Sequence, residues 1–123
     1  MIASPTPRGD LRIYEFDGTG SSFRSASDIL GEVFGAGANF AVMPVARLDP
    51  AFFQLRTGVA GEIMQKFVNY GIRLAIIGDI SALVAASKPL HDLVYEMSQG
   101  STIWFLTTRE QLDTRLTSRA GNP

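Results

Sequence analysis

The stretch FFQLRTGVAGEIMQKFVNYGIRLAIIGD, residues 52–79, decides the fold. Its first half has apolar residues at helical spacing from about Gly58 onward, and Tyr70-Gly71 ends that helix. Residues 72–77 are apolar enough for a central parallel strand, which ends at Gly78-Asp79. We therefore expect a helix that leads into a strand with side chains buried on both faces of the sheet.

The same alternation of strand-like and helix-like segments runs through the rest of the chain. Further strands are predicted at residues 11–16, 40–43 and 102–106. Further helices follow the predicted N-caps Ser25, Ser87 and Thr108, and Asp49-Pro50 predicts a single helical turn through Phe53. The order βαβαβαβα predicts an α/β domain with a four-stranded, mainly parallel sheet and right-handed crossovers. We expect a single domain at residues 11–116, with flexible termini at 1–10 and 117–123.

Composition and charge exclude several classes of protein. A chain of 123 residues is one domain, and 46% hydrophobic with 19% charged residues is typical of globular proteins. The net charge of −1 argues against a nucleic-acid binder or a binder of acidic membranes. Without cysteine there is neither a disulfide framework nor a cysteine-based metal site. No signal peptide or membrane span is recognisable, so we expect a cytoplasmic protein.

The central helix has two distinct faces. The residues predicted to be buried are Val59, Ala60, Ile63, Met64, Phe67 and Val68, and the polar stripe is Glu62, Gln65, Lys66 and Asn69. Glu62 and Lys66 have the favourable i, i+4 order, so the stripe is either a solvated face or a partner-binding face. Gly58 and Gly61 each lower helix propensity by about 1 kcal/mol relative to alanine. We interpret both as points where the neighbouring strand, or alternatively a ligand, approaches the backbone closely.

The motif FFxLRTGxAGExxQKFxNY, followed by a short apolar strand and GD, resembles the bacterial domain of unknown function 4180 (DUF4180) over residues 11–116. That resemblance implies no established activity. The segment is more distantly similar to STAS domains, the anti-sigma-factor antagonist fold, in which a phosphorylatable Ser-Gly opens a helix. The similarity implies a STAS-like fold, with Thr57-Gly58 at the position of the Ser-Gly. Arg56 departs from the small or acidic residues that are usual beside it.

Thr57 stands just before a helix whose first four N–H groups lack intrahelical partners. It is either a plain N-cap or a phosphoacceptor or anion site, since a helix N-terminus favours negative charge. Arg56 would either clamp that anion or pair with Asp17 or Asp79. Both aspartates end predicted parallel strands, the edge at which open α/β sheets bind ligands. We therefore expect these four residues to cluster at the carboxyl edge of the sheet.

The enzyme motifs that we considered are incomplete. His91 is the only histidine and has no GxSxG elbow to serve. The segment DGTGSS at 17–22 lacks the third glycine of a dinucleotide loop, because Phe23 replaces it. Nothing in the spacing of the acidic residues requires a magnesium site, although four of them could contribute: Asp17, Asp49, Asp79 and Glu96. We predict no cofactor, no metal and no catalytic residue.

Two hypotheses for function follow from this sequence. The first is a non-enzymatic regulatory or adaptor domain that docks a protein partner through the Thr57 rim and the 62–69 face. The alternative is a domain that binds a small molecule or anion at the same rim, with catalysis by Asp17, Arg56 and Asp79 left open. The residues predicted to bind are Asp17, Arg56, Thr57, Gly58, Glu62, Lys66 and Asp79. A homo-oligomer is compatible with either hypothesis.

Overall fold

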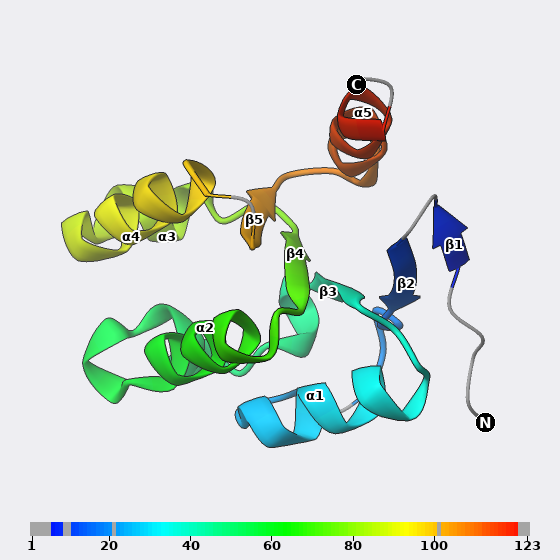
Figure 1. The fold of residues 1–123 in the computed structure, drawn as a ribbon. Coiled ribbons are helices and arrows are strands. Elements are labelled where there is room, and N and C mark those ends of the chain that lie inside the picture. Colours follow the sequence, from blue (N-terminus) through cyan, green and yellow to red (C-terminus); the bar gives the residue numbers. More distant parts are fainter. Residues whose placement is uncertain (1–5, 9–10, 21, 101, 121–123) are drawn as a thin grey trace.

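A five-stranded sheet forms the centre of the protein (Figure 1), as seen in a computed structural model that describes residues 6–8, 11–20, 22–100 and 102–120. Its strands are β1 (Thr6–Arg8), β2 (Leu11–Glu15), β3 (Phe40–Pro44), β4 (Arg73–Ile77) and β5 (Ile103–Leu106). They lie side by side in the order of the chain. Strands β2 to β5 are all parallel, and β1 pairs with β2 in the antiparallel direction.

Five α-helices surround the sheet: α1 (Ala26–Gly35), α2 (Val59–Tyr70), α3 (Ser81–Ala86), α4 (Lys88–Ser98) and α5 (Arg109–Ala120). Three short 3₁₀ turns connect β3 to α2, and these are η1 (Val45–Arg47), η2 (Pro50–Phe53) and η3 (Leu55–Thr57). Among the described residues, no helix is long and apolar enough to cross a bilayer.

The helices divide unequally between the two faces of the sheet. Right-handed crossovers that step in the same direction along a sheet place their helices on one face. Accordingly α1, α2 and the α3–α4 pair lie on one side, and α5 alone covers the other (Figure 1). In the described residues no strand follows α5. Helix α5 is therefore not part of a crossover between parallel strands, and it can lie on the other face.

Each face of the sheet carries its own apolar core, because alternate residues of a strand point to opposite sides. On the first face, Met43 and Ile76 pack with the inner stripes of α1 and α2. On the second, Phe40 and Trp104 meet at 5.6 Å between ring centroids and pack beneath α5. An ion pair between Arg109 and Glu15 also ties the start of α5 to the end of β2.

The four parallel strands and their helices confirm the predicted fold class. Leu74, Ala75 and Ile76 of β4 are at most 1% exposed, so the predicted central strand is buried on both faces. The N-caps at Ser25, Ser87 and Thr108 are also confirmed by side-chain hydrogen bonds to the backbone of Ser27, Leu90 and Gln111. The turn at 50–53 begins with Asp49 Oδ1 accepting from the N–H of Ala51 at 2.8 Å.

Four details differ from the sequence prediction. Val68 was predicted to be buried but is 52% exposed, because it lies about 100° round the helix from Phe67, beyond the inner stripe. The short helix α3 was not predicted, and neither was β1, which falls within the 1–10 segment assigned to a flexible terminus. Helix α5 continues to Ala120, past the predicted domain end at 116. Residues 1–5, 9–10 and 121–123 of the two predicted termini lie outside the described residues.

Candidate functional site

The carboxyl edge of the sheet is where all four parallel strands end. Asp17 follows β2, Asp79 follows β4, and the connection after β3 carries Thr57 to the start of α2. Because α2 must return the chain to the start of β4, its N-terminus lies on the same side. These residues therefore share one edge, but their contacts differ along it.

At one end of this edge the structure contains a cavity of about 220 Å³, which we call the β4–β5 pocket. The strand ends contribute Val45, Ile76, Gly78, Phe105, Leu106 and Thr107 to its lining. The start of α3 and the side of α4 contribute Asp79, Ile80, Ser81, Val84 and Val94. The pocket is thus mostly apolar, with one carboxylate and two hydroxyl groups.

The β4–β5 pocket exists because two adjacent strands send their chains to opposite faces. After β4 the chain enters α3, whose Val84 packs on the first core, whereas after β5 it enters α5 on the second core. Figure 1 shows the two connections leaving the sheet in different directions. Neighbouring parallel strands that part in this way leave a crevice between them, and open α/β sheets bind their ligands in such crevices.

Gly78 lets the backbone pass close to the far wall of the pocket. Its φ of +151° is a conformation that side chains rarely adopt, and a Cβ there would lie 2.7 Å from Cγ2 of Val45. Its N–H donates to the carbonyl of Leu106 at 2.9 Å, which holds the ends of β4 and β5 together. The backbone conformation and the close approach of Val45 therefore require glycine at position 78, the first residue of the Gly78-Asp79 pair.

Asp79 is the charged group of the pocket. Its Oδ1 accepts from the backbone N–H of Ser81 at 2.9 Å, which starts α3. Hydrogen bonds from the Ser81 side chain and then its backbone lower the pKa of the Asp79 carboxyl below the usual value for aspartate. The side chain is exposed, so at neutral pH it presents a negative charge to solvent at the edge of the cavity.

Thr57, the centre of the predicted site, is exposed, but its hydroxyl forms hydrogen bonds to the protein's own backbone. Its Oγ1 lies 2.7 Å from the carbonyl oxygen of Ala51 and 2.8 Å from that of Gln54, and accepts from the N–H of Val59 at 3.2 Å. The N-cap position itself belongs to Gly58, which has a left-handed φ of +77°. We call residues 50–59 the Thr57 junction, because this hydroxyl ties η2, η3 and α2 together.

Asp17 closes its own loop in a similar way. Its Oδ1 accepts from the backbone N–H and the hydroxyl of Thr19 at 3.1 and 3.2 Å. Its backbone carbonyl accepts from Nη1 of Arg47 at 2.8 Å, and the same guanidinium lies 4.9 Å from the ring centre of Phe23. The loop after β2 is therefore fastened to η1.

The remaining predicted residues make no contact with Asp17 or Asp79 that the structure shows in its described part. Within the part of the chain that the structure describes, Arg56 forms no ion pair with Asp17 or Asp79, contrary to one predicted alternative. Glu62 and Lys66 are exposed on α2, and no ion pair joins them in the same described ranges. A Cβ at Gly61 would meet nothing within 4 Å, so neither a strand nor α2 itself requires glycine there.

Lys66 lies instead in a second hollow, between α1 and α2. Phe34 and Tyr70 meet there with ring centroids 5.5 Å apart, and both are about half exposed, at 48% and 57%. Val68, also exposed, is on the same helix. All four residues of the predicted polar stripe are exposed, and the apolar pair Phe34 and Tyr70 lies beside that stripe, next to Lys66.

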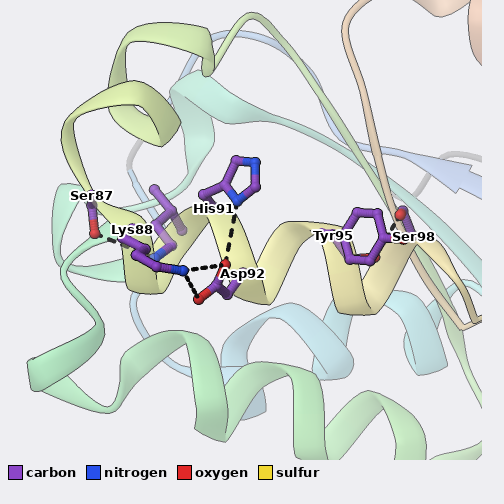
Figure 2. Close-up of polar contacts among 7 residues, drawn as sticks. Ser87, Lys88, His91, Asp92, Tyr95 and Ser98 are labelled. Carbon is purple, nitrogen blue, oxygen red and sulfur yellow. Dashed lines mark hydrogen bonds and ion pairs between the residues drawn. The ribbon is translucent and has the colours of Figure 1, made fainter.

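His91 lies on the solvent side of α4. Figure 2 shows it beside Asp92, with Nδ1 3.4 Å from the aspartate Oδ1, and Lys88 on the other side of the same carboxylate. The hydrogen bond from Lys88, followed by that from His91, lowers the pKa of Asp92. This cluster does not line the β4–β5 pocket.

The described residues contain no cluster of three or more side chains of the kinds that bind metal ions. No three His, Asp or Glu side chains among residues 6–8, 11–20, 22–100 and 102–120 are grouped so that they could hold an ion. The four acidic residues considered for magnesium are therefore not brought together.

Sequence reasoning found Asp79 but missed the pocket around it. Five apolar or hydroxyl residues that follow Asp79 or face it were not singled out: Val45, Ile80, Ser81, Val84 and Phe105. One signal was available, because an Asp two residues before a Ser, followed by alanine-rich SALVAA, is a start for a short helix. Placing α3 would have put Ile80 and Val84 on one side of it, next to the strand ends.

Comparison with protein families matches residues 10–116 to the family described as "Domain of unknown function (DUF4180)". The match covers most of the chain, so the protein belongs to this family. The comparisons with curated proteins and with solved structures gave no significant match. The similarity to STAS domains accordingly rests on one motif and on the order of elements.

Proposed function

We propose that this member of the DUF4180 family binds a small molecule in the β4–β5 pocket. The observation that carries the proposal is the crevice at the carboxyl edge, where the chain leaves β4 and β5 toward opposite faces. A mostly apolar lining with a few convergent polar groups is the usual composition of a ligand site. The proposal keeps the strand-end rim of the sequence hypothesis, moves its centre from Thr57 to Asp79, and keeps the expected cytoplasmic location.

The volume limits what can bind. About 220 Å³ is below the range of about 300–1,000 Å³ that is usual for drug-sized ligands. The expected ligand is therefore a small metabolite rather than a nucleotide or a peptide.

The proposal is tested by filling the pocket. Ligand-observed NMR with a set of small fragments should detect binding to the wild type, and Val84→Trp should abolish it because the indole occupies the cavity. Leu83→Trp is the matched control, since Leu83 is on the same helix, is exposed, and does not line the pocket. Thr107→Trp closes the cavity from the opposite wall and guards against a local effect on α3. The proposal fails if no fragment binds the wild type, or if folded Val84→Trp and Thr107→Trp proteins bind equally well.

A second candidate function, docking of a protein partner, rests on the exposed pair Phe34 and Tyr70 beside Lys66. Monomeric proteins rarely leave several large apolar side chains together in water without a use for them. The partner hypothesis of the sequence analysis therefore shifts from the polar stripe to the outer side of α1 and α2. Isothermal titration with proteins encoded beside the gene should show binding that Phe34→Ser and Tyr70→Ser remove, whereas Tyr95→Ser, on α4, leaves it unchanged.

A further inference from the structure

The charges of the residues that line the β4–β5 pocket determine which charge its ligand should carry. Apart from Asp79, none of the lining residues carries a charge, and no lysine, arginine or histidine is among them. An anion would therefore face a carboxylate without a compensating cation, which is unfavourable. The predicted anionic ligand does not suit this pocket.

Backbone donors do not restore an anion site. The N–H group of Ser81 at the start of α3 already donates to Asp79 Oδ1. The protein's own carboxylate thus takes the place that a bound phosphate or carboxylate would use. A carboxylate has about four lone-pair positions, so the bonds to Ser81 leave capacity for a further donor.

The walls add a second requirement. Val45 and Phe105 come from the strand side, and Val84 and Val94 come from the helix side, so the interior is aliphatic with one aromatic ring. Each of these side chains packs against the first core, which fixes the shape of the walls. A ligand that fills this space must expose an apolar body and keep its polar group at the mouth.

We propose that the β4–β5 pocket binds a small primary amine, with the ammonium group at Asp79 and an aliphatic or aromatic body between α3, α4 and the end of β5. This inference rests on the proposed function, because it assumes that the pocket is a binding site. An ammonium can donate one of its three N–H groups to the Asp79 carboxylate, and the hydroxyl oxygens of Thr107 and Ser81 in the lining are acceptors for the others.

The test uses three probes with one carbon skeleton: 3-methylbutylamine, 3-methylbutanol and 3-methylbutanoate. NMR titration at low salt should show the amine binding wild type about two- to fivefold more tightly than the alcohol, as expected for one exposed charge pair. The carboxylate should bind more weakly than either. Raising the salt concentration should reduce the advantage of the amine, since exposed charges are screened.

Asp79→Asn should remove the preference for the amine and leave the affinity for the alcohol unchanged. Asparagine keeps an oxygen that can accept from the Ser81 N–H, so the start of α3 is retained. Asp92→Asn is the matched control, because it removes an exposed aspartate with a lowered pKa outside the pocket. It should leave all three affinities at wild-type values.

The outcomes separate this inference from the proposed function. If alcohol and amine bind wild type equally, or if Asp79→Asn keeps the preference, the amine assignment is wrong and the pocket remains a binding site. If none of the three probes binds while other fragments do, the assignment is also wrong. If no fragment of any kind binds wild type, or if folded Val84→Trp and Thr107→Trp proteins bind fragments as well as wild type does, the proposed function itself has failed.

Discussion

The two halves of the carboxyl edge use similar residues for opposite purposes. At the β2–β3 half, Asp17 and Thr57 bond to neighbouring backbone, and Arg47 holds the loop after β2. At the β4–β5 half, Asp79 also bonds to the backbone but stands beside a cavity. The difference arises from topology, because the chain leaves β2 and β3 toward the same face and leaves β4 and β5 toward opposite faces. Polar residues at strand ends thus mark the carboxyl edge of the sheet. Whether a cavity forms there depends on the face toward which each following connection runs.

The largest change in stability is expected from Gly78→Ala, at the β4–β5 half of the carboxyl edge. The new Cβ would clash with Val45, and the residue would be held at a φ that alanine avoids, so unfolding free energy should fall by about 2–4 kcal/mol. Chemical denaturation measures the loss. Adding Val45→Ala should recover only part of it, since the contact with Cγ2 is then lost while the contact with the Val45 Cβ at 2.8 Å and the unfavourable φ both remain. A stability within about 0.5 kcal/mol of wild type, the size of an ordinary surface effect, would show that the strand ends do not approach as described.

A smaller effect is expected at the β2–β3 half from Thr57→Ala. Loss of the hydroxyl removes its bonds to Ala51, Gln54 and Val59, which should cost about 1–2 kcal/mol of unfolding free energy. Thr57→Ser keeps the hydroxyl and should stay close to wild type. Probe binding in the β4–β5 pocket should be the same in all three proteins. If Thr57→Ala lowers that affinity as much as Asp79→Asn does, the two halves are not independent.

Gly61→Ala should increase the stability of the protein, in contrast to the two substitutions above. Gly61 lies inside α2, and an added Cβ meets nothing within 4 Å, so alanine should raise the unfolding free energy by about 0.5–1 kcal/mol. Thermal and chemical unfolding both report this change. A destabilised Gly61→Ala protein would indicate that the start of α2 does need close backbone approach, as the sequence first suggested.

The smallest effect concerns acid stability at Asp79. Its carboxyl pKa is lower in the folded protein than the usual 3.8, so its contribution is complete above that pH and is lost as the pH falls through the folded value. The stability difference between wild type and Asp79→Asn should therefore shrink as the pH is lowered below 3.8. Denaturation curves of both proteins at neutral pH and in acid measure it. A difference that is independent of pH would mean that Ser81 does not stabilise the ionised carboxylate.

The sequence predicted what depends on local pattern. The apolar run around Ile76 identifies the central strand, and the caps at Ser25, Asp49 and Ser87 mark where turns and helices begin. The prediction went wrong at Val68, where apolar character was read as burial although the residue lies off the inner stripe. The sequence could not show which groups the Thr57 hydroxyl contacts, because a threonine before a helix has the same appearance whether its hydroxyl faces solvent or a backbone carbonyl.

The pocket could not be predicted from the sequence for a different reason. The pocket forms only because α5 covers the second face of the sheet. Helix α5 packs there through Leu112 and Leu116, since α1, α2 and α4 already cover the first face. The pocket also requires α3, a helix of six residues that is too short for a clear apolar period. Both are properties of the assembled chain rather than of any segment.

The order of the strands also bears on how the protein is made. Each parallel strand pairs with the strand that precedes it, so register partners such as Ile13 and Phe40, or Leu74 and Ile103, are only about thirty residues apart. None of the described strands has to wait for a later one to be inserted between it and its neighbour. The sheet can grow in the direction of synthesis, one strand and helix at a time, as the chain leaves the ribosome. Helix α5 is the last of the described elements in chain order, so until it docks, the face of the sheet that carries Phe40 and Trp104 is exposed to solvent and to other chains.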